Sequence, residues 1–146
     1  MPYCTIDDIK SKRIPEQTLI QLTDDQGLGQ IDTAVVDGII SDADELIDGY
    51  IRERYELPLA NVPGMLKTLS VDISVYNLYG RRPEFETPKA VNDKHGVALK
   101  ILMSIQKGEI KLGIAGAVSP ASTSSPARAK ASTPTRIFTD DNLNRY

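Results

Sequence analysis

Residues 32–55 read DTAVVDGIISDADELIDGYIRERY, and this stretch decides the fold. Its apolar side chains recur at intervals of three and four residues, which is the spacing of one face of an α-helix. The apolar stripe consists of Val36, Ile39, Ile40, Ala43, Leu46, Ile47, Tyr50 and Ile51. Asp32 or Thr33 can cap the helix, because short polar side chains accept hydrogen bonds from its first free N–H groups. We therefore predict one helix that ends near Tyr55 and spans roughly 33 Å.

Two further long helices are predicted after this one. Residues 65–82 carry apolar side chains around most of the helical circumference, so this helix should lie between other elements. Its narrow polar wedge consists of Lys67, Ser70, Ser74 and Asn77. Residues 87–107 begin with Thr87-Pro88 and are followed by Gly108, which matches the preference for proline at the start of a helix and for glycine after its end.

Short helices are expected before residue 32, one capped by Thr5 and one that begins at Pro15. Residues 1–112 therefore predict an all-α fold, a small bundle of three long helices plus short N-terminal helices. This bundle is the predicted helical domain of the chain.

The composition changes after Leu112. Residues 113–135 are mainly Gly, Ala, Ser, Thr and Pro, a composition typical of a linker. Residues 136–146 regain bulky side chains and form a predicted anchor peptide, with Arg136, Ile137, Phe138 and Tyr146 as its binding residues. The alternation in residues 136–139 favours an extended arm that could add a short strand to a partner. The alternative is an end of the chain without ordered structure.

Composition and charge limit the class of protein. The chain has 17 Lys and Arg against 20 Asp and Glu, and a net charge of −3 does not favour general binding to nucleic acid. Residues 1–114 are acidic, whereas residues 115–146 have four basic and two acidic side chains. The apolar runs are far shorter than the roughly 20 residues of a membrane span, and no signal peptide pattern is present. A single cysteine, Cys4, whose role stays open, fits synthesis in the reducing cytoplasm.

The sequence contains no recognisable catalytic signature. Cys4 and His95 are too far apart in the sequence to predict a metal site on their own. Gly27-Leu28-Gly29 lacks the third glycine of a dinucleotide-binding loop. We therefore expect no enzyme activity, no catalytic residues, no cofactor and no metal.

Two polar residues are predicted inside the bundle. Asp72 falls on an apolar sector of its helix, and a buried carboxylate needs a partner. The candidate partners are His95, Arg52, Arg54 or a residue of another subunit. His95 lies in the middle of the apolar stripe of residues 87–107, and we interpret it as a buried imidazole with a hydrogen-bond partner. Both residues are predicted to be structural rather than catalytic.

The helix of residues 32–55 also offers a candidate subunit interface. Gly38 and Gly49 are eleven residues apart and share the face opposite the apolar stripe, together with Asp42, Glu45 and Arg52. Glycines on the outward face of a helix allow a neighbouring subunit to approach closely. The strongly apolar helix of residues 65–82 could supply a second contact face. The alternative is that the glycine face is an ordinary solvated surface.

Several stretches of the chain resemble the Mu-like bacteriophage neck-protein family. They are residues 3–9 (YCTIDDI), 39–51 (IISDADELIDGYI), 54–59 (RYELPL), 71–74 (VDIS), 79–82 (YGRR) and 136–143 (RIFTDDNL). The pattern of an acidic helix ending in tyrosine, followed by Arg-Tyr-x-Leu-Pro-Leu, is fairly specific.

The resemblance implies a head–tail connector, or adaptor, in the neck of a tailed-phage virion assembled in the bacterial cytoplasm. Such adaptors form a ring, about twelve copies in the usual case, below the portal protein. The ring extends the channel for double-stranded DNA, which passes without sequence-specific binding, and it docks a stopper or tail-terminator protein. A C-terminal extension anchored to the portal or to a neighbouring subunit would suit residues 136–146. No membrane contact is implied.

Two other classes remain open. A tail-completion protein, or another interaction protein of the virion, would differ mainly in its partner. A small DNA-binding regulatory protein would bind DNA in a salt-dependent way, which the acidic body of the chain argues against.

Overall fold

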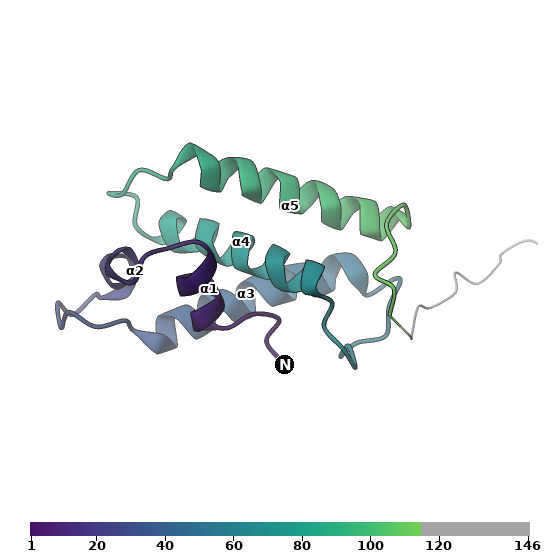
Figure 1. Ribbon diagram of the computed structural model, residues 1–146, viewed down its shortest axis with the longest axis horizontal. Helices are drawn as coiled ribbons and strands as arrows, with labels where there is room; N and C mark the ends of the chain where they lie inside the picture. The colour runs from purple at the N-terminus through teal and green to yellow at the C-terminus, as the bar shows by residue number, and fades with distance from the viewer. Residues whose placement is uncertain (115–146) are drawn as a thin grey trace, which may run out of the picture.

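The computed structural model describes residues 1–114, and this part of the chain forms five α-helices (Figure 1). They are α1 (Ile6–Lys12), α2 (Glu16–Thr23), α3 (Thr33–Ile51), α4 (Gly64–Arg81) and α5 (Lys89–Lys107). The predicted all-α bundle of three long helices and short N-terminal helices is confirmed. None of these helices is long and apolar enough to cross a membrane. The predicted arm, with its strand and anchor residues, lies outside the described residues.

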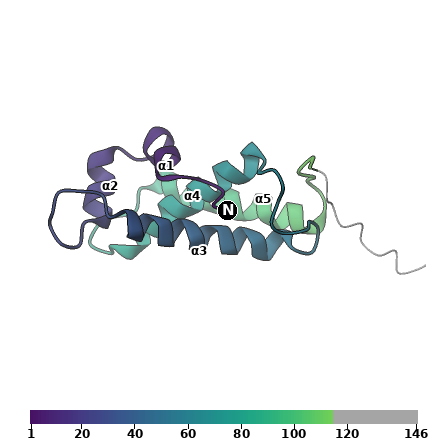
Figure 2. The same cartoon turned by 90° about the horizontal axis from the view of Figure 1, so that it is seen from below.

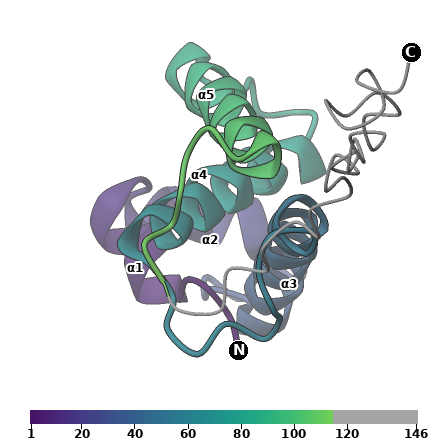
Figure 3. The same cartoon turned by 90° about the vertical axis from the view of Figure 1, so that its right-hand side faces the viewer.

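The helix α4 lies at the centre of the bundle. It contacts α1, α2, α3 and α5. Seen along the bundle in Figure 3, α5 and α3 lie on different sides of the molecule, and α1 covers a third side. Figure 2 shows that α3 runs along the long axis, with α2 near its N-terminal end. The central position explains why α4 is apolar around most of its circumference, as the sequence predicted.

Two groups of buried side chains form the core, and α4 contributes to both. The first group joins α3, α4 and α5 and includes Ile47, Ile51, Leu66, Ile73, Leu102 and Ile105. The second joins α1, α2, α3 and α4 and includes Ile9, Leu19, Leu22, Val36, Val71 and Leu78. Leu46, which the sequence assigned to the apolar stripe of α3, is 38% exposed at its edge.

The helix α3 begins where predicted and ends earlier than predicted. The Asp32 side chain accepts hydrogen bonds from the backbone N–H groups of Ala34 (3.1 Å) and Val35 (3.3 Å), which caps the helix. The helix stops at Ile51, and a turn follows before Tyr55. This turn buries Tyr55 in the first core group, where its hydroxyl accepts a hydrogen bond from the N–H of Leu112 at 2.9 Å.

The end of α5 is fixed by a glycine and an arginine. Gly108 has a φ of +82°, the left-handed conformation that suits a residue after a helix. Arg54, in the turn after α3, donates from Nε to the Gln106 carbonyl (2.9 Å) and from Nη2 to the Lys107 carbonyl (2.8 Å). A Cβ at position 108 would lie 2.9 Å from the guanidinium carbon of Arg54. Glycine therefore allows the close approach that ties α5 to the end of α3.

Candidate subunit interface

The predicted interface residues come together on the outward face of α3. Gly38, Asp42, Glu45, Gly49 and Arg52 are all exposed, because they lie opposite the buried stripe of the helix. A Cβ added at Gly38 or Gly49 would meet no other atom within 4 Å. The helix is thus narrow and open along this side. We call these five positions the α3 face.

The charges of α3 are nearly all of one sign. Between Thr33 and Ile51 the helix carries five carboxylates and no Lys or Arg. Within residues 1–114, none of the ion pairs includes a carboxylate of α3. Arg52 supplies a cation at the end of the α3 face, where its Nε lies 3.4 Å from the Asp48 carbonyl oxygen. The α3 face therefore presents acidic charge that this part of the chain does not neutralise.

Two carboxylates at the edge of α3 hold the N-terminal segment. Asp44 accepts hydrogen bonds from the Tyr3 backbone N–H (2.8 Å) and from the Ser70 hydroxyl (2.7 Å). The Tyr3 hydroxyl donates to the Asp48 carboxylate. Burial raises the pKa of Asp44, and burial together with the nearby Asp48 raises the pKa of Tyr3. The sequence analysis missed this arrangement, because helical periodicity does not show which distant segment meets an acidic residue.

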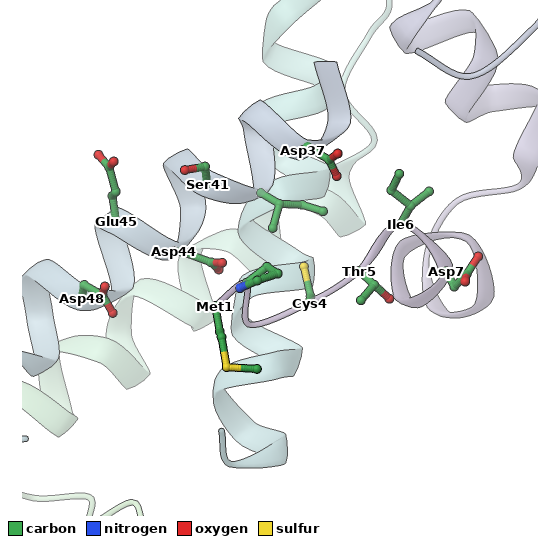
Figure 4. Close-up of a pocket in the computed structure, with 12 residues that line it drawn as sticks. Met1, Cys4, Thr5, Ile6, Asp7, Asp37, Ser41, Asp44, Glu45 and Asp48 are labelled. Carbon is green, nitrogen blue, oxygen red and sulfur yellow. The ribbon is translucent and has the colours of Figure 1, made fainter. Parts of the chain in front are cut away.

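A pocket of about 740 Å³ lies between the N-terminal segment and α3 (Figure 4). Its acidic lining consists of Asp7, Asp37, Asp44, Glu45 and Asp48. Within residues 1–114, no group of three or more His, Cys, Asp or Glu side chains is placed to hold a metal ion. A second hollow, of about 440 Å³, borders the other side of α3 beside Gly38, Asp42 and Arg81. The α3 face is therefore a ridge with a hollow on each side.

The position of Asp72 corrects one prediction. It is buried, with 9% of its surface exposed, and Oδ1 lies 2.5 Å from Nε of Arg13. The partner is thus none of the predicted residues, His95, Arg52 or Arg54. Arg13 caps the end of α1, which packs against α4 and brings the guanidinium to the carboxylate. No local sequence pattern indicates this pair, because its two residues are joined only by the tertiary packing.

The prediction of a buried His95 is also wrong. His95 is partly exposed, and its ring stacks on Tyr76 of α4 with ring centroids 3.8 Å apart and an angle of 5° between the planes. Partial burial lowers the pKa of the imidazole. Its position in the apolar stripe brings the ring against α4, but Tyr76 covers only part of the imidazole.

Cys4 lies inside the bundle. It is buried in the second core group, and its Sγ lies 3.2 Å from the Ser70 hydroxyl oxygen. Burial raises the pKa of the thiol, so little reactive thiolate is present at neutral pH. Ser70 and Ser74 of α4 are also fully buried. Two residues of the predicted polar wedge of α4 therefore face the interior of the molecule.

The suggestion that helix 65–82 supplies a second subunit face is not supported by its position. The apolar surface of α4 is used inside the molecule, where it belongs to both core groups. Its exposed large apolar side chain is Met65, in the first turn. The predicted anchor residues Arg136, Ile137, Phe138 and Tyr146 lie outside the described residues.

The fold and the site define a small all-α protein whose described part carries an open acidic helix face. The chain belongs to the family described as Bacteriophage Mu, Gp36, whose family model matches residues 3–131. It is also similar to Gene product J of Escherichia phage Mu, with 27% identity over 114 residues that cover 78% of each chain. The resemblance to Mu-like phage proteins noted in the sequence is thereby confirmed. The family match ends before the predicted anchor peptide.

Proposed function

We propose that this protein is a head–tail connector subunit in the neck of a Mu-like phage virion, without catalytic activity of its own. Copies of the chain form a ring below the portal protein, about twelve if the usual symmetry holds. The ring extends the DNA channel and docks the stopper or the tail terminator. Residues 136–146 anchor each copy to the portal or to a neighbouring copy.

The observation that carries this proposal is the open acidic face of α3 in a member of a phage family. A ring subunit needs lateral surfaces that remain available after the monomer has folded. The α3 face is such a surface, because its carboxylates have no ion-pair partner within residues 1–114. The stable helical core behind it can hold this face rigid during assembly.

The net acidic charge of residues 1–114 supports passage of DNA rather than its capture. Phosphate groups bind Lys and Arg with release of counterions, and a surface rich in carboxylates suppresses this binding. A channel built mainly from acidic subunits would therefore let a duplex slide. The same charge disfavours a regulatory DNA-binding protein.

Electron microscopy of the purified full chain, alone and mixed with virion necks, tests the proposal. We expect rings whose central opening accommodates a DNA duplex, and added density at the neck when the protein is supplied. Gly38→Leu should block ring formation without unfolding the protein, because the new side chain projects into open space on the α3 face. A monomer that never binds phage particles would overturn the proposal.

A capture assay tests the proposed anchor. The double variant Ile137→Ala with Phe138→Ala should lower capture of the portal protein at least about tenfold, if these side chains fill pockets on the partner. Ser124→Ala, in the linker, is the matched control and should bind as the wild type does. Capture of tail subunits with no binding to the portal would indicate a tail-completion protein instead.

A further inference from the structure

The outward face of α5 has the opposite charge to the α3 face. The helix α5 contains four lysines and one aspartate. Lys89, Lys100 and Lys107 are exposed and lie eleven and seven residues apart, which places them in one row on the side away from Ala98, Leu102 and Ile105. We call this row and its flanking residues the α5 face. Within residues 1–114 no ion pair includes a lysine of α5.

The α5 face also exposes apolar side chains. Val97 is 54% exposed and Met103 is 44% exposed, and both flank the lysine row. These two side chains would be removed from water if a partner covered the lysine row. The α3 face offers a suitable counterpart, because Gly38 and Gly49 leave open space and Leu46 is 38% exposed beside them.

We propose that the α5 face of one copy binds the α3 face of the next copy. This inference rests on the proposed function and names the two surfaces that the ring would use. The lysine row of α5 lies against the surface carboxylates of α3, among them Asp42 and Glu45. Val97 and Met103 pack over the narrow glycine side of α3. Each helix has 19 residues, so the two surfaces match in length.

Charge determines that this contact joins two different faces. Two α3 faces would bring carboxylates together, and two α5 faces would bring lysines together, and like charges disfavour both arrangements. The contact is heterologous when a copy uses its α3 face for one neighbour and its α5 face for another, and it then leaves one α3 face and one α5 face free at the ends of every open chain. Because α3 and α5 lie on different sides of the molecule (Figure 3), one copy can contact two neighbours at once. Such a contact closes into a ring when the rotation between copies permits it.

Charge reversal on each face provides the test. The α3 variant carries Asp42→Lys and Glu45→Lys, and the α5 variant carries Lys100→Glu and Lys107→Glu, both in the full chain. By analytical ultracentrifugation, each variant alone should need at least about tenfold more protein for half-assembly than the wild type. An equal mixture should assemble as the wild type does, because the basic α3 face of one variant matches the acidic α5 face of the other. Raising NaCl from about 0.05 M to about 0.5 M should weaken wild-type assembly by screening the contact.

A control variant separates this contact from a general effect of charge. Glu56→Lys with Glu86→Lys also reverses two exposed carboxylates, both outside the α3 and α5 helices, and should assemble as the wild type does. Circular dichroism of all variants checks that each remains folded.

Three results would overturn the inference. The first is normal assembly of the reversed variants. The second is a mixture that fails to assemble, which would indicate that the α3 face binds another part of the chain, such as the basic residues after 114. The third is an α5 variant that loses DNA binding but assembles normally, which would assign the lysine row to phosphate. The proposed function survives all three if the wild type still forms rings, whereas a wild type that never assembles contradicts both proposals.

Discussion

Charged residues are used in opposite ways on two sides of this molecule. Around α1, α2 and α4, cations and carboxylates meet within the chain: Arg13 pairs with Asp72, Lys67 with Asp8, and both Arg81 and Arg82 with Asp25. On the outward faces of α3 and α5, the described part of the chain leaves carboxylates and lysines without ion pairs.

The difference teaches which charges serve the fold and which are available for a partner. A charge that is removed from water needs a counter-charge nearby, so substitution in the paired region should affect stability. A charge that stays in water contributes little to folding, so substitution on the outward faces should affect association instead. The following predictions test this division, beginning with the largest expected effect on stability.

Arg13→Ala should give the largest loss, because it leaves the Asp72 carboxylate buried without its cation. We expect the free energy of unfolding to fall by about 2–3 kcal/mol, somewhat less than for a fully buried pair because Arg13 is partly exposed. Urea denaturation measures the change. The double variant Arg13→Met with Asp72→Leu should recover most of the loss. No recovery would mean that packing, rather than the lost pair, explains the effect.

Gly108→Ala tests the arginine that joins α3 to α5. The positive φ and the close Arg54 guanidinium both oppose a side chain at this position. We expect a loss of about 1–2 kcal/mol in the free energy of unfolding, measured by thermal denaturation. Gly80→Ala, where an added Cβ meets no atom within 4 Å and φ is not positive, is the control and should not destabilise the protein. Equal effects at both positions would contradict the need for glycine at position 108.

Asp8→Asn tests how much the paired Asp8 carboxylate contributes to stability, and how this contribution changes with pH. Burial opposes ionisation of Asp8, but hydrogen bonds from Lys67 and Thr5 outweigh it and lower its pKa to about 2 from 3.8. A folded-state pKa below the unfolded value stabilises the fold above the unfolded pKa, and this contribution disappears as the pH falls toward about 2.

The Asp8→Asn variant should therefore be less stable than the wild type by about 1 kcal/mol at neutral pH. The two proteins should converge as the pH falls from about 4 toward about 2. Denaturation at a series of pH values measures the difference. A difference that stays constant with pH would show that the charge of Asp8 does not matter.

Gly38→Ala should have the smallest effect on stability, and with the opposite sign. Alanine is favoured over glycine inside a helix, and the added Cβ has free space. We expect the free energy of unfolding to rise by about 0.5–1 kcal/mol. Gly27→Ala is the contrasting control, because its φ of +71° disfavours a side chain. A destabilised Gly38→Ala monomer would show that the α3 face is already occupied within a single copy.

The sequence predicted what depends on local spacing. The stripe of α3, its Asp32 cap and the glycine after α5 follow from helical periodicity and terminal preferences, and the structure has all three. The exposed α3 face follows from the same periodicity.

The sequence did not predict contacts between distant segments. Arg13 reaches Asp72 across 59 positions of the sequence, and Tyr3 reaches Asp44 across 41. Both contacts exist because α1 and the N-terminal segment lie over α3 and α4. His95 differed from expectation for a related reason, because a stripe position does not tell how much of the ring the neighbouring helix covers. The sequence analysis did not identify the α5 face, because exposed lysines on a helix look like an ordinary solvated surface. Only the structure shows that they lie on a different side of the molecule from the acidic α3 face.

The hydrogen bond from Leu112 to Tyr55 ties the end of the described chain to the turn that follows α3. Every copy of the fold therefore places Leu112 at the same point, beside the turn that follows α3. In the ring proposed above, these points would lie evenly spaced on a circle, and the proposed anchor peptides, which follow them in the sequence, would meet a symmetric partner as a set. Weak individual attachments would then add up through high local concentration, so that one failed attachment would not release the partner.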